Sequence, residues 1–337
     1  MVWIQFAVCL AIIIIAGTRL PKYGDIIAEK TGLGHVWVGI VLLATVTSLP
    51  EVATGISSVA IIQSPDLAIG DLFGASLINL GIIAVIDVLY KKGPVLHLLG
   101  TGIVLATILS MLLIAAAAAS ILLAHSGFNL NVFGFIGIYS PILFCLFLIS
   151  QYMLFRFKTR QPDTTDNANS QSTTYASVSL KRTLLYFGLT AIAIVGAGIW
   201  LGFIGDQISN STGLKASFVG TLFLAFSTTA PEMVVSISAA RMGALEMAVA
   251  NVVGSNLFNI GVIIFLIDLF FSEGPILKYV STGHILTALF ALMMSSIVII
   301  GIIFRPKFWM KSWVGMDTTF IAILYIAALV TLYFFGR

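Results

Sequence analysis

Long apolar runs separated by short polar stretches dominate the pattern of the chain. Ten of these runs approach or exceed the ~20 residues that a helix needs to cross a bilayer, and helices satisfy their own backbone there. The expected spans lie near residues 2–19, 34–60, 66–89, 95–124, 131–156, 182–204, 215–240, 244–271, 279–304 and 313–335. The pattern predicts an all-α polytopic membrane protein.

Composition also indicates a membrane protein and argues against a soluble domain. Hydrophobic residues make up 59% of the 337 positions and charged residues 9%, whereas soluble domains carry about 25% charged residues. Cys9 and Cys145 lie in separate apolar runs, so the cysteines give no disulfide or metal pattern. We expect a multi-pass protein of the cell membrane with lipid around it and no nucleic-acid partner.

The basic residues predict an orientation. With both termini outside, 14 of the 17 Lys and Arg side chains fall on the inner side, and only Lys215, Lys278 and Arg337 remain outside. The one polar, low-complexity stretch, residues 158–181, then becomes a flexible cytoplasmic linker.

The chain also contains an internal repeat. Residues 23–58 align without a gap on residues 204–239, with 15 of 36 positions identical. Each half holds five expected spans, and because five is odd the second half must enter the membrane inverted. We therefore expect a first transmembrane repeat at 1–157, the linker at 158–181, and a second, inverted repeat at 182–337, a common plan for transporters.

Both copies place a Pro-Glu pair inside an apolar run. Pro50 and Pro231 lack an amide hydrogen and should break their helices, leaving carbonyls that are tolerated only beside a polar cavity. Hydroxyls and a carboxylate stand next to each expected break: Thr47, Ser48 and Glu51, then Thr228, Thr229 and Glu232. These oxygens are the ligands of hard cations such as Ca²⁺ or Na⁺, and two intramembrane carboxylates match one divalent ion.

A second matched pair of segments follows each break. Residues 69–81 align with residues 249–261, and polar or small residues recur every four positions on one helix face: Asp71, Ala75 and Asn79, then Asn251, Ser255 and Asn259. Close helix packing explains the small residues. A buried amide needs polar partners, which the Pro-Glu break of the opposite repeat would offer.

These segments resemble the two alpha repeats of the cation/Ca²⁺ exchanger superfamily, especially its prokaryotic sodium/calcium exchanger branch. The resemblance rests on residues 46–51 and 227–232, which match a G-T-S-L-P-E element, and on residues 70–81 and 250–261. It implies ten helices, with four central broken or tilted helices around the cation sites. It also implies a ligand set: the Glu51 and Glu232 carboxylates, the Ala44, Thr47, Ala225 and Thr228 carbonyls, the Ser48 and Thr229 hydroxyls, Asn79 and Asn259 centrally, and Ser255 at a flanking Na⁺ site.

The chain departs from the family pattern at several of these positions. Ala75 replaces the serine equivalent to Ser255, so one Na⁺ site loses a side-chain oxygen. Asp71 replaces the usual Asn and is an accessory ligand candidate. Asn259 stands where K⁺-dependent relatives carry Asp, which argues against K⁺ cotransport. Val46 and Ser227 replace the family glycines, which removes backbone freedom at both hinges.

The expected function is a secondary active antiporter that exchanges Ca²⁺ for Na⁺ by alternating access, without a cofactor or an obligatory protein partner. Exchange of protons for Ca²⁺ or another divalent cation is the alternative, since a buried carboxylate can hold a proton. A passive cation channel would use the same oxygens. An intramembrane aspartyl protease is disfavoured, because the residue at 68 before Gly70-Asp71 is Ala rather than Gly.

The remaining polar residues receive structural interpretations. Asp87 lies close to Lys91 and Lys92, which suggests an interfacial pair, as for Asp268 near the end of its span. Asp25 precedes a repeated T-G-L turn, which suggests a helix cap. The histidines lack metal-ligand spacing.

Overall fold

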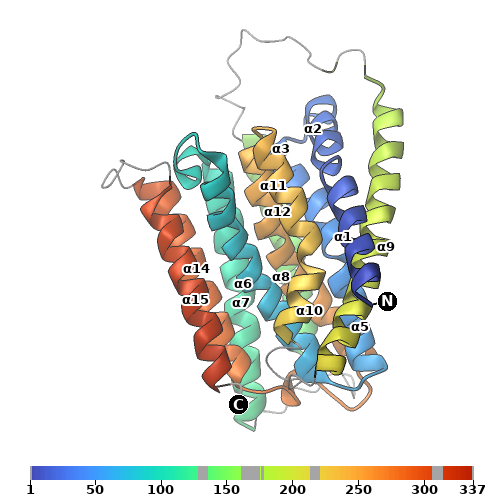
Figure 1. Ribbon diagram of the computed structural model, residues 1–337. Coiled ribbons are helices and arrows are strands. Elements are labelled where there is room, and N and C mark those ends of the chain that lie inside the picture. Colours follow the sequence, from blue (N-terminus) through green and yellow to red (C-terminus); the bar gives the residue numbers. More distant parts are fainter. Residues whose placement is uncertain are drawn as a thin grey trace.

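A computed structural model of the chain describes residues 2–127, 136–160, 175, 178–212, 221–305 and 314–335. The described part is a bundle of long helices lying side by side (Figure 1). Most of the expected linker 158–181 falls outside the described residues, as do Lys215 and Arg337 of the orientation argument.

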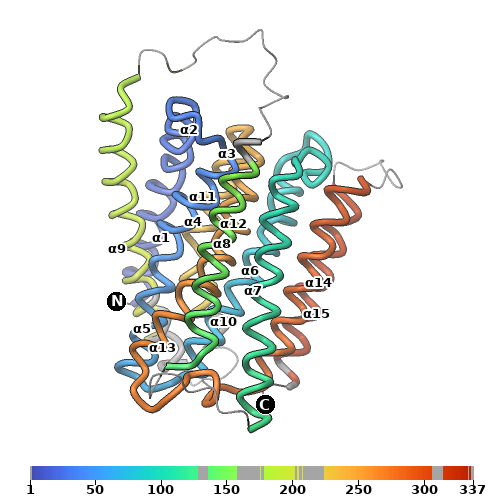
Figure 2. Tube along the Cα trace, turned by 180° about the vertical axis from the view of Figure 1, so that it is seen from behind, coloured from blue at the N-terminus to red at the C-terminus, as the bar shows by residue number. Residues whose placement is uncertain are grey.

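The first half contains these elements in chain order: α1 (Val2–Gly17), α2 (Leu20–Thr31), α3 (His35–Trp37), the π-helical turn η1 (Val38–Leu43), α4 (Ala44–Thr47), α5 (Leu49–Ala60), α6 (Pro65–Tyr90), the 3-10 turn η2 (Val95–Leu98), α7 (Thr101–His125) and α8 (Tyr139–Arg160). Viewed from behind, α8 lies over the bundle (Figure 2), where it packs on α7 and on η4 of the second half.

The second half repeats this order with its own irregularities: α9 (Leu180–Thr212), α10 (Thr221–Thr228), α11 (Ala230–Arg241), α12 (Leu245–Phe258), the π-helical turn η4 (Asn259–Ile263), α13 (Ile264–Phe270), the 3-10 turn η5 (Ile276–Lys278), α14 (Gly283–Phe304) and α15 (Met316–Phe335). The long helix α6 has no π turn, whereas its counterpart α12–η4–α13 is interrupted by one.

Seven helices of the described chain are long and apolar enough to cross a membrane, and eight if the pair bent by 42° between residues 35–47 and 49–60 counts as one span. These helices establish an all-helical, multi-pass membrane protein. Helical residues occupy parts of all ten expected ranges, but the ten-helix inverted arrangement stays a prediction.

Both expected helix breaks are present, one residue beyond the positions that the two prolines predict, Val46–Thr47 and Ser227–Thr228. The helix axis breaks at Ser48, between α4 and α5, and at Thr229, between α10 and α11. Each break residue keeps a backbone hydrogen bond from its own N–H, at 3.0 Å to Ala44 O and 3.0 Å to Ala225 O. The local cause is that proline occupies the first turn of the following helix and cannot donate to the preceding turn.

Glycines let the broken helices approach their neighbours closely. A Cβ on Gly254 of α12 would lie 2.6 Å from the Ile40 Cα and 2.9 Å from the Ala44 Cβ. At the equivalent place in the other half, a Cβ on Gly74 of α6 would lie 3.2 Å from the Ala225 Cβ. Each long helix therefore packs against the break of the opposite half, which brings the two repeated motifs to one place.

Asp268 is a structural carboxylate that ties three segments together. It accepts hydrogen bonds from Gly137 N (2.9 Å), Tyr139 Oη (2.8 Å) and Ile276 N (2.8 Å), and a short one from Ser140 Oγ. The interfacial pair expected for Asp268 is not what these contacts show, because its partners are backbone N–H groups and hydroxyls that hold the loop after α13 and the start of α8.

Asp87 has the equivalent structural role in the other half. It accepts from Val95 N (2.6 Å), Gly315 N (2.7 Å) and the Thr318 hydroxyl. The interfacial pair expected with Lys91 and Lys92 is wrong, since these backbone and hydroxyl donors fully engage the carboxylate. A buried backbone N–H group without a hydrogen-bond partner costs free energy, so the N–H groups near Asp87 bind its carboxylate, whereas a lysine can remain solvated.

Asp25 is not a helix cap. It lies inside α2, where one oxygen is 2.7 Å from His35 Nε2 and the other accepts a 2.8 Å hydrogen bond from Tyr175 Oη. Burial and this bond to the carboxylate raise the pKa of Tyr175 to about 12. The contact joins a residue of the expected linker to the first half, which a local capping rule could not foresee.

Candidate cation site

Two fully buried glutamates follow the two helix breaks. Glu51 lies in the first turn of α5 and Glu232 in the first turn of α11, and both side chains are 0% exposed. The partial positive charge of a helix N-terminus favours a carboxylate in this position. It does not replace a counter-charge, so these two residues are where a cation would be most strongly stabilised.

Glu232 is held in place by hydroxyls. Its Oε1 accepts a 3.0 Å hydrogen bond from Ser48 Oγ, across the two halves, and a 3.4 Å bond from Ser255 Oγ of α12. Its Oε2 has no hydrogen-bond partner in the described part of the chain. One oxygen therefore orients the carboxylate, and the other is left for a ligand.

Glu51 is not held in the same way. The Thr229 hydroxyl lies within interacting reach of its carboxylate, but no hydrogen bond of normal geometry reaches either oxygen from the described residues. The counterpart of Ser255 is Ala75, which has no hydroxyl to offer. An unpaired buried polar group costs about 1–3 kcal/mol, more when charged, so a bound cation would relieve a real penalty.

The threonines before each break contact the opposite half. Thr47 Oγ1 lies 3.1 Å from Leu43 O of its own helix and 3.4 Å from Asn251 Oδ1 of α12. Thr228 Oγ1 lies 3.1 Å from Leu224 O and 3.2 Å from Asp71 Oδ1 of α6. These pairs confirm that the face bearing Asp71 and the face bearing Asn251 each meet the other half's break.

Asp71, the accessory candidate, bridges two broken helices. It is 1% exposed and accepts from Thr54 Oγ1 of α5 at 3.1 Å as well as from Thr228 of α10. Asn251 occupies the equivalent place and donates a 2.9 Å bond to Ser236 Oγ. The carboxylate is therefore a third acid close to the breaks, with both of its oxygens engaged by hydroxyls.

The two central asparagines differ from each other. Asn79 Nδ2 donates a 2.9 Å hydrogen bond to Asn256 Oδ1, while its Oδ1 has no partner. Asn259, the first residue of η4, has no partner for either side-chain atom within the described chain. The expectation that the opposite Pro-Glu break supplies their partners is met for neither: Asn79 pairs with an asparagine of α12, and Asn259 has no side-chain partner in the described chain.

Asn256 is the residue that sequence reasoning missed. It is 1% exposed, and besides accepting from Asn79 it donates to the Ser76 carbonyl oxygen at 3.4 Å. The signal was present, because Asn256 lies inside the repeated motif directly after Ser255. Its partner could not be read, because that partner belongs to the other half.

Together the unpartnered atoms form an oxygen-rich set: Glu51 Oε1 and Oε2, Glu232 Oε2, Asn79 Oδ1, Asn259 Oδ1 and Thr229 Oγ1. Carboxylate, amide and hydroxyl oxygens suit Ca²⁺ and Na⁺. The Ala44 and Ala225 carbonyl oxygens each accept one backbone bond, and each also has a threonine hydroxyl nearby, Thr47 Oγ1 at 3.4 Å and Thr228 Oγ1 at 3.2 Å. No cluster of three or more His, Cys, Asp or Glu with metal-holding geometry occurs in the part of the chain the structure describes.

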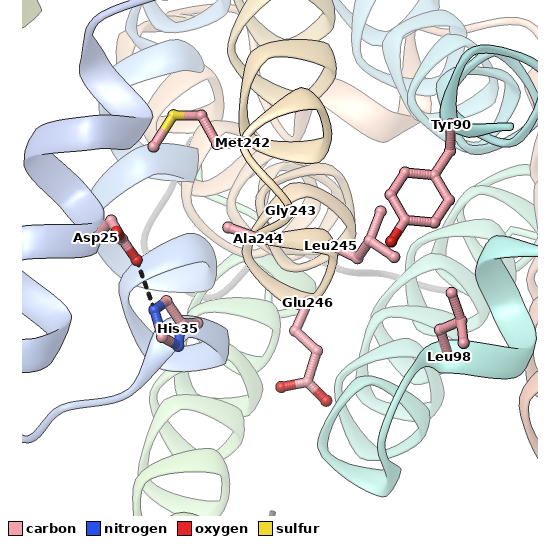
Figure 3. A pocket seen from close by; sticks show the side chains of 9 residues that line it. All are labelled: Asp25, His35, Tyr90, Leu98, Met242, Gly243, Ala244, Leu245 and Glu246. Carbon is pink, nitrogen blue, oxygen red and sulfur yellow. Dashed lines mark hydrogen bonds and ion pairs between the residues drawn. The ribbon is translucent and has the colours of Figure 1, made fainter. Parts of the chain in front are cut away.

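A cavity of about 500 Å³ lies elsewhere, at the α2–α3 end of the bundle (Figure 3). Its acidic groups are already engaged: Asp25 by His35, and Glu246 Oε1 by Gly100 N at 3.0 Å. Glu246 thus orders the loop before α7, and none of the expected ligands lines this cavity.

The geometry agrees with comparison to known proteins. The family model described as sodium/calcium exchanger protein matches residues 1–153 and 182–335. The chain belongs to the sodium/calcium exchanger family. That family comprises membrane transporters of cations rather than enzymes, so the transporter class predicted from the duplicated Pro-Glu motif is confirmed.

Similar proteins cover the chain to different extents. The inner membrane protein YrbG of Escherichia coli strain K12 is 24% identical over 314 residues, which covers 90% of this chain and 87% of that protein. The sodium/calcium exchanger MaX1 of Methanosarcina acetivorans is 33% identical over 123 residues, covering 36% of this chain and 32% of that protein.

The fold has a solved counterpart. The sodium-calcium exchanger NCX_Mj, soaked with 2.5 mM Na⁺ and 10 mM Sr²⁺, superposes with a TM-score of 0.72 and covers 98% of this chain and 100% of its own. Sequence identity in that comparison is 19%, so it establishes the exchanger fold.

Proposed function

We propose that the protein is a secondary active antiporter that exchanges Ca²⁺ for Na⁺ across the membrane by alternating access. One observation carries the proposal: two fully buried glutamates, Glu51 and Glu232, stand at breaks contributed by opposite halves, with three carboxylate oxygens lacking a partner in the described chain. Two carboxylates supply the charge that a dehydrated divalent ion neutralises, and Na⁺ competes for the same oxygens.

The proposed cation ligands fall into three groups. Carboxylates come from Glu51 and Glu232, with Asp71 as an accessory acid. Side-chain oxygens come from Asn79, Asn259, Ser255, Ser48 and Thr229. Backbone carbonyls at the breaks complete the set and belong to Ala44, Thr47, Ala225 and Thr228.

The proposed topology has ten helices arranged as two inverted five-helix repeats, 1–157 and 182–337, joined by a cytoplasmic linker at 158–181. Both termini lie outside. The internal repeat of 15 identities in 36 positions and the distribution of basic residues support this arrangement. Inversion would make the site accessible from opposite sides by equivalent movements of the two halves.

The breaks offer a hinge for alternating access. Gly198 of α9 packs closely on both prolines. A Cβ added to Gly198 would lie 2.5 Å from Pro50 Cγ and 3.5 Å from Pro231 Cγ. Helix α1 packs along α9. A shared movement of α1 and α9 across both prolines would therefore change access to the site from either side.

Proton coupling is the second candidate, and Asp71 favours it. A third buried carboxylate beside the breaks adds a group that can hold a proton when no cation is bound. A passive channel is less favoured, since two fully buried carboxylates bind a cation tightly, whereas rapid flow needs weak binding.

Counterflow in proteoliposomes tests these alternatives. Purified protein is reconstituted in vesicles loaded with Na⁺, and ⁴⁵Ca²⁺ uptake is measured after dilution into choline. The antiporter predicts uptake that requires internal Na⁺ and is abolished when internal and external Na⁺ are equal. Uptake driven by a pH gradient without Na⁺ would establish the proton alternative, and uptake without any exchangeable internal ion would establish a channel.

A further inference from the structure

The central asparagines of the two halves differ in their hydrogen bonding. Asn79 lies in the regular helix α6, and its amide nitrogen is bound to Asn256 Oδ1 at 2.9 Å. Asn259 is the equivalent residue, 180 positions later, and begins the π-helical turn η4 with no partner for either amide atom in the described chain. Such turns are common at functional sites, where they displace a side chain from the regular helical position.

Asn256 is suited to fixing the orientation of Asn79. Its side chain is itself fixed, because its Nδ2 donates to the Ser76 carbonyl oxygen at 3.4 Å while its Oδ1 accepts from Asn79. An amide whose nitrogen is engaged must point its oxygen elsewhere. The unpartnered Asn79 Oδ1 is the atom left to face a cation.

The other half lacks this device. The residue equivalent to Asn256 is Ser76, and its short side chain donates 2.9 Å back to Leu72 O of its own helix. The Ser76 hydroxyl therefore forms no hydrogen bond with Asn259. Both positions are completely buried, so the difference does not arise from solvent exposure.

We propose that Asn256 is a positioning residue that holds the Asn79 amide with its oxygen toward the transported cation, and that the absence of an equivalent partner leaves Asn259 able to adapt to different ions. This inference rests on the proposed function. Asn79 presents a fixed oxygen that favours tight binding of one ion. Asn259 can turn either amide atom toward the site, so it can accommodate a second ion.

The test is a double-mutant cycle in proteoliposomes. Asn256→Ser, Asn79→Ala and the combined variant are compared in Na⁺-driven ⁴⁵Ca²⁺ uptake, with KM and maximal rate measured separately. A net hydrogen bond contributes about 0.5–1.5 kcal/mol, so Asn256→Ser should raise the Ca²⁺ KM by about threefold to tenfold while leaving the maximal rate nearly unchanged. If Asn256 acts through Asn79, adding Asn256→Ser to Asn79→Ala should change the KM no further.

Two matched variants sharpen the result. Ser76→Ala removes only the hydroxyl that bonds to Leu72 O and keeps the backbone carbonyl that accepts from Asn256, so its KM should equal that of the original protein. Asn256→Asp keeps the acceptor oxygen for Asn79 and adds a negative charge, so its Ca²⁺ KM should not rise. A purely structural role would instead lower thermal stability and maximal rate in both Asn256 variants.

An unchanged KM in Asn256→Ser, or independent effects that multiply in the combined variant, would overturn the inference. Should Asn256→Ser fail to fold, a raised KM in Asn256→Asp would overturn it as well. Failure of the proposed function has a different signature, because the unmodified protein would then show no Na⁺-dependent Ca²⁺ uptake from which to measure a KM.

Discussion

The Ser48 hydroxyl donates a 3.0 Å hydrogen bond to Glu232 Oε1, joining the break of one half to the acid of the other. The reciprocal contact is weaker: the Thr229 hydroxyl lies beside the Glu51 carboxylate, but no hydrogen bond of normal geometry joins them in the described chain. Equivalent sequence positions thus produce one oriented and one unoriented carboxylate. Binding should therefore depend more on the Ser48 hydroxyl than on that of Thr229.

Ser48→Ala should raise the Ca²⁺ KM by about tenfold, since a hydrogen bond to a charged group contributes about 1.5–3 kcal/mol. Thr229→Ser retains a hydroxyl at the other break and serves as the matched control, with little expected change. Both values come from Na⁺-driven ⁴⁵Ca²⁺ uptake. Equal KM values for Ser48→Ala and the unmodified protein would show that the bond has no part in positioning Glu232.

Glu51→Gln and Glu232→Gln should each abolish Ca²⁺ uptake. Removing one member of a buried charge assembly costs about 3–5 kcal/mol, which corresponds to a loss of roughly two to four orders of magnitude. Glu246→Gln is the control: Glu246 lines the separate cavity, and a glutamine oxygen can still accept from Gly100 N. Near-normal exchange in either Glu51→Gln or Glu232→Gln would remove the two-carboxylate centre from consideration.

Ala75→Ser should strengthen Na⁺ binding. Ala75 is completely buried on the α6 face that also carries Asp71 and Asn79, and the new hydroxyl would restore the oxygen that Ser255 supplies in the other half. We expect the Na⁺ concentration for half-maximal inhibition of Ca²⁺ uptake to fall by about threefold, the effect of one modest polar contact.

The control for this prediction is Ala84→Ser. Ala84 is nine residues further along α6, about 180° around the helix, and is also buried. Its hydroxyl would face away from the site, so Na⁺ inhibition should not change. If Ala75→Ser and Ala84→Ser behave identically, the missing oxygen at position 75 has no effect on Na⁺ binding.

Gly198→Ala should impair both stability and turnover. The added Cβ would lie 2.5 Å from Pro50 Cγ, a contact that the rigid proline ring cannot relieve, so α9 must move away from the break. Overpacking of this kind costs about 1–3 kcal/mol. Gly196→Ala is the matched control on the same helix, because nothing lies within 4 Å of its added Cβ.

Thermal unfolding and the maximal rate of uptake measure this prediction. We expect a lower unfolding temperature and slower exchange for Gly198→Ala, with Gly196→Ala unchanged or slightly stabilised by its better helix propensity. A Gly198→Ala protein as stable and as fast as Gly196→Ala would mean that α9 does not bear on the break during transport.

Asp268→Asn should destabilise the protein without changing cation affinity. The carboxylate accepts from two backbone N–H groups and two hydroxyls, and an amide would turn a donor toward some of them. Each buried group left unpaired costs about 1–3 kcal/mol. Thermal unfolding should shift downward, whereas the Ca²⁺ KM of the folded fraction should remain the same. A raised KM at unchanged stability would assign Asp268 to transport instead.

Local chemistry accounts for what could be predicted along the chain. Apolar runs of membrane-spanning length gave the class, because the cost of exposing backbone in lipid leaves few alternatives. Pro50 and Pro231 located both helix breaks to within one residue, since the missing N–H acts on its own turn. The duplicated Pro-Glu motif also identified the family and the two acids that both prove to be completely buried.

The sequence predicts that the two halves meet at the breaks, but it does not predict which atoms pair across them. The pairing of Asp71 with Thr228, of Asn79 with Asn256 and of Ser48 with Glu232 joins residues 157 to 184 positions apart. A repeat predicts that equivalent residues make equivalent contacts, and several here do not. The helix cap predicted for Asp25 and the interfacial pair predicted for Asp87 are wrong for a related reason, because their partners lie on other segments.

The amino-acid order by itself therefore determined that this is a membrane exchanger with two repeated, proline-broken acidic elements, since turn geometry and hydrophobicity act over a few residues. Only the tertiary structure decided which carboxylate is oriented, which asparagine is held and which acids merely tie loops together. The physical reason is that a hydrogen bond depends on the separation and direction of two particular atoms, and in a bundle those are set by how distant helices pack.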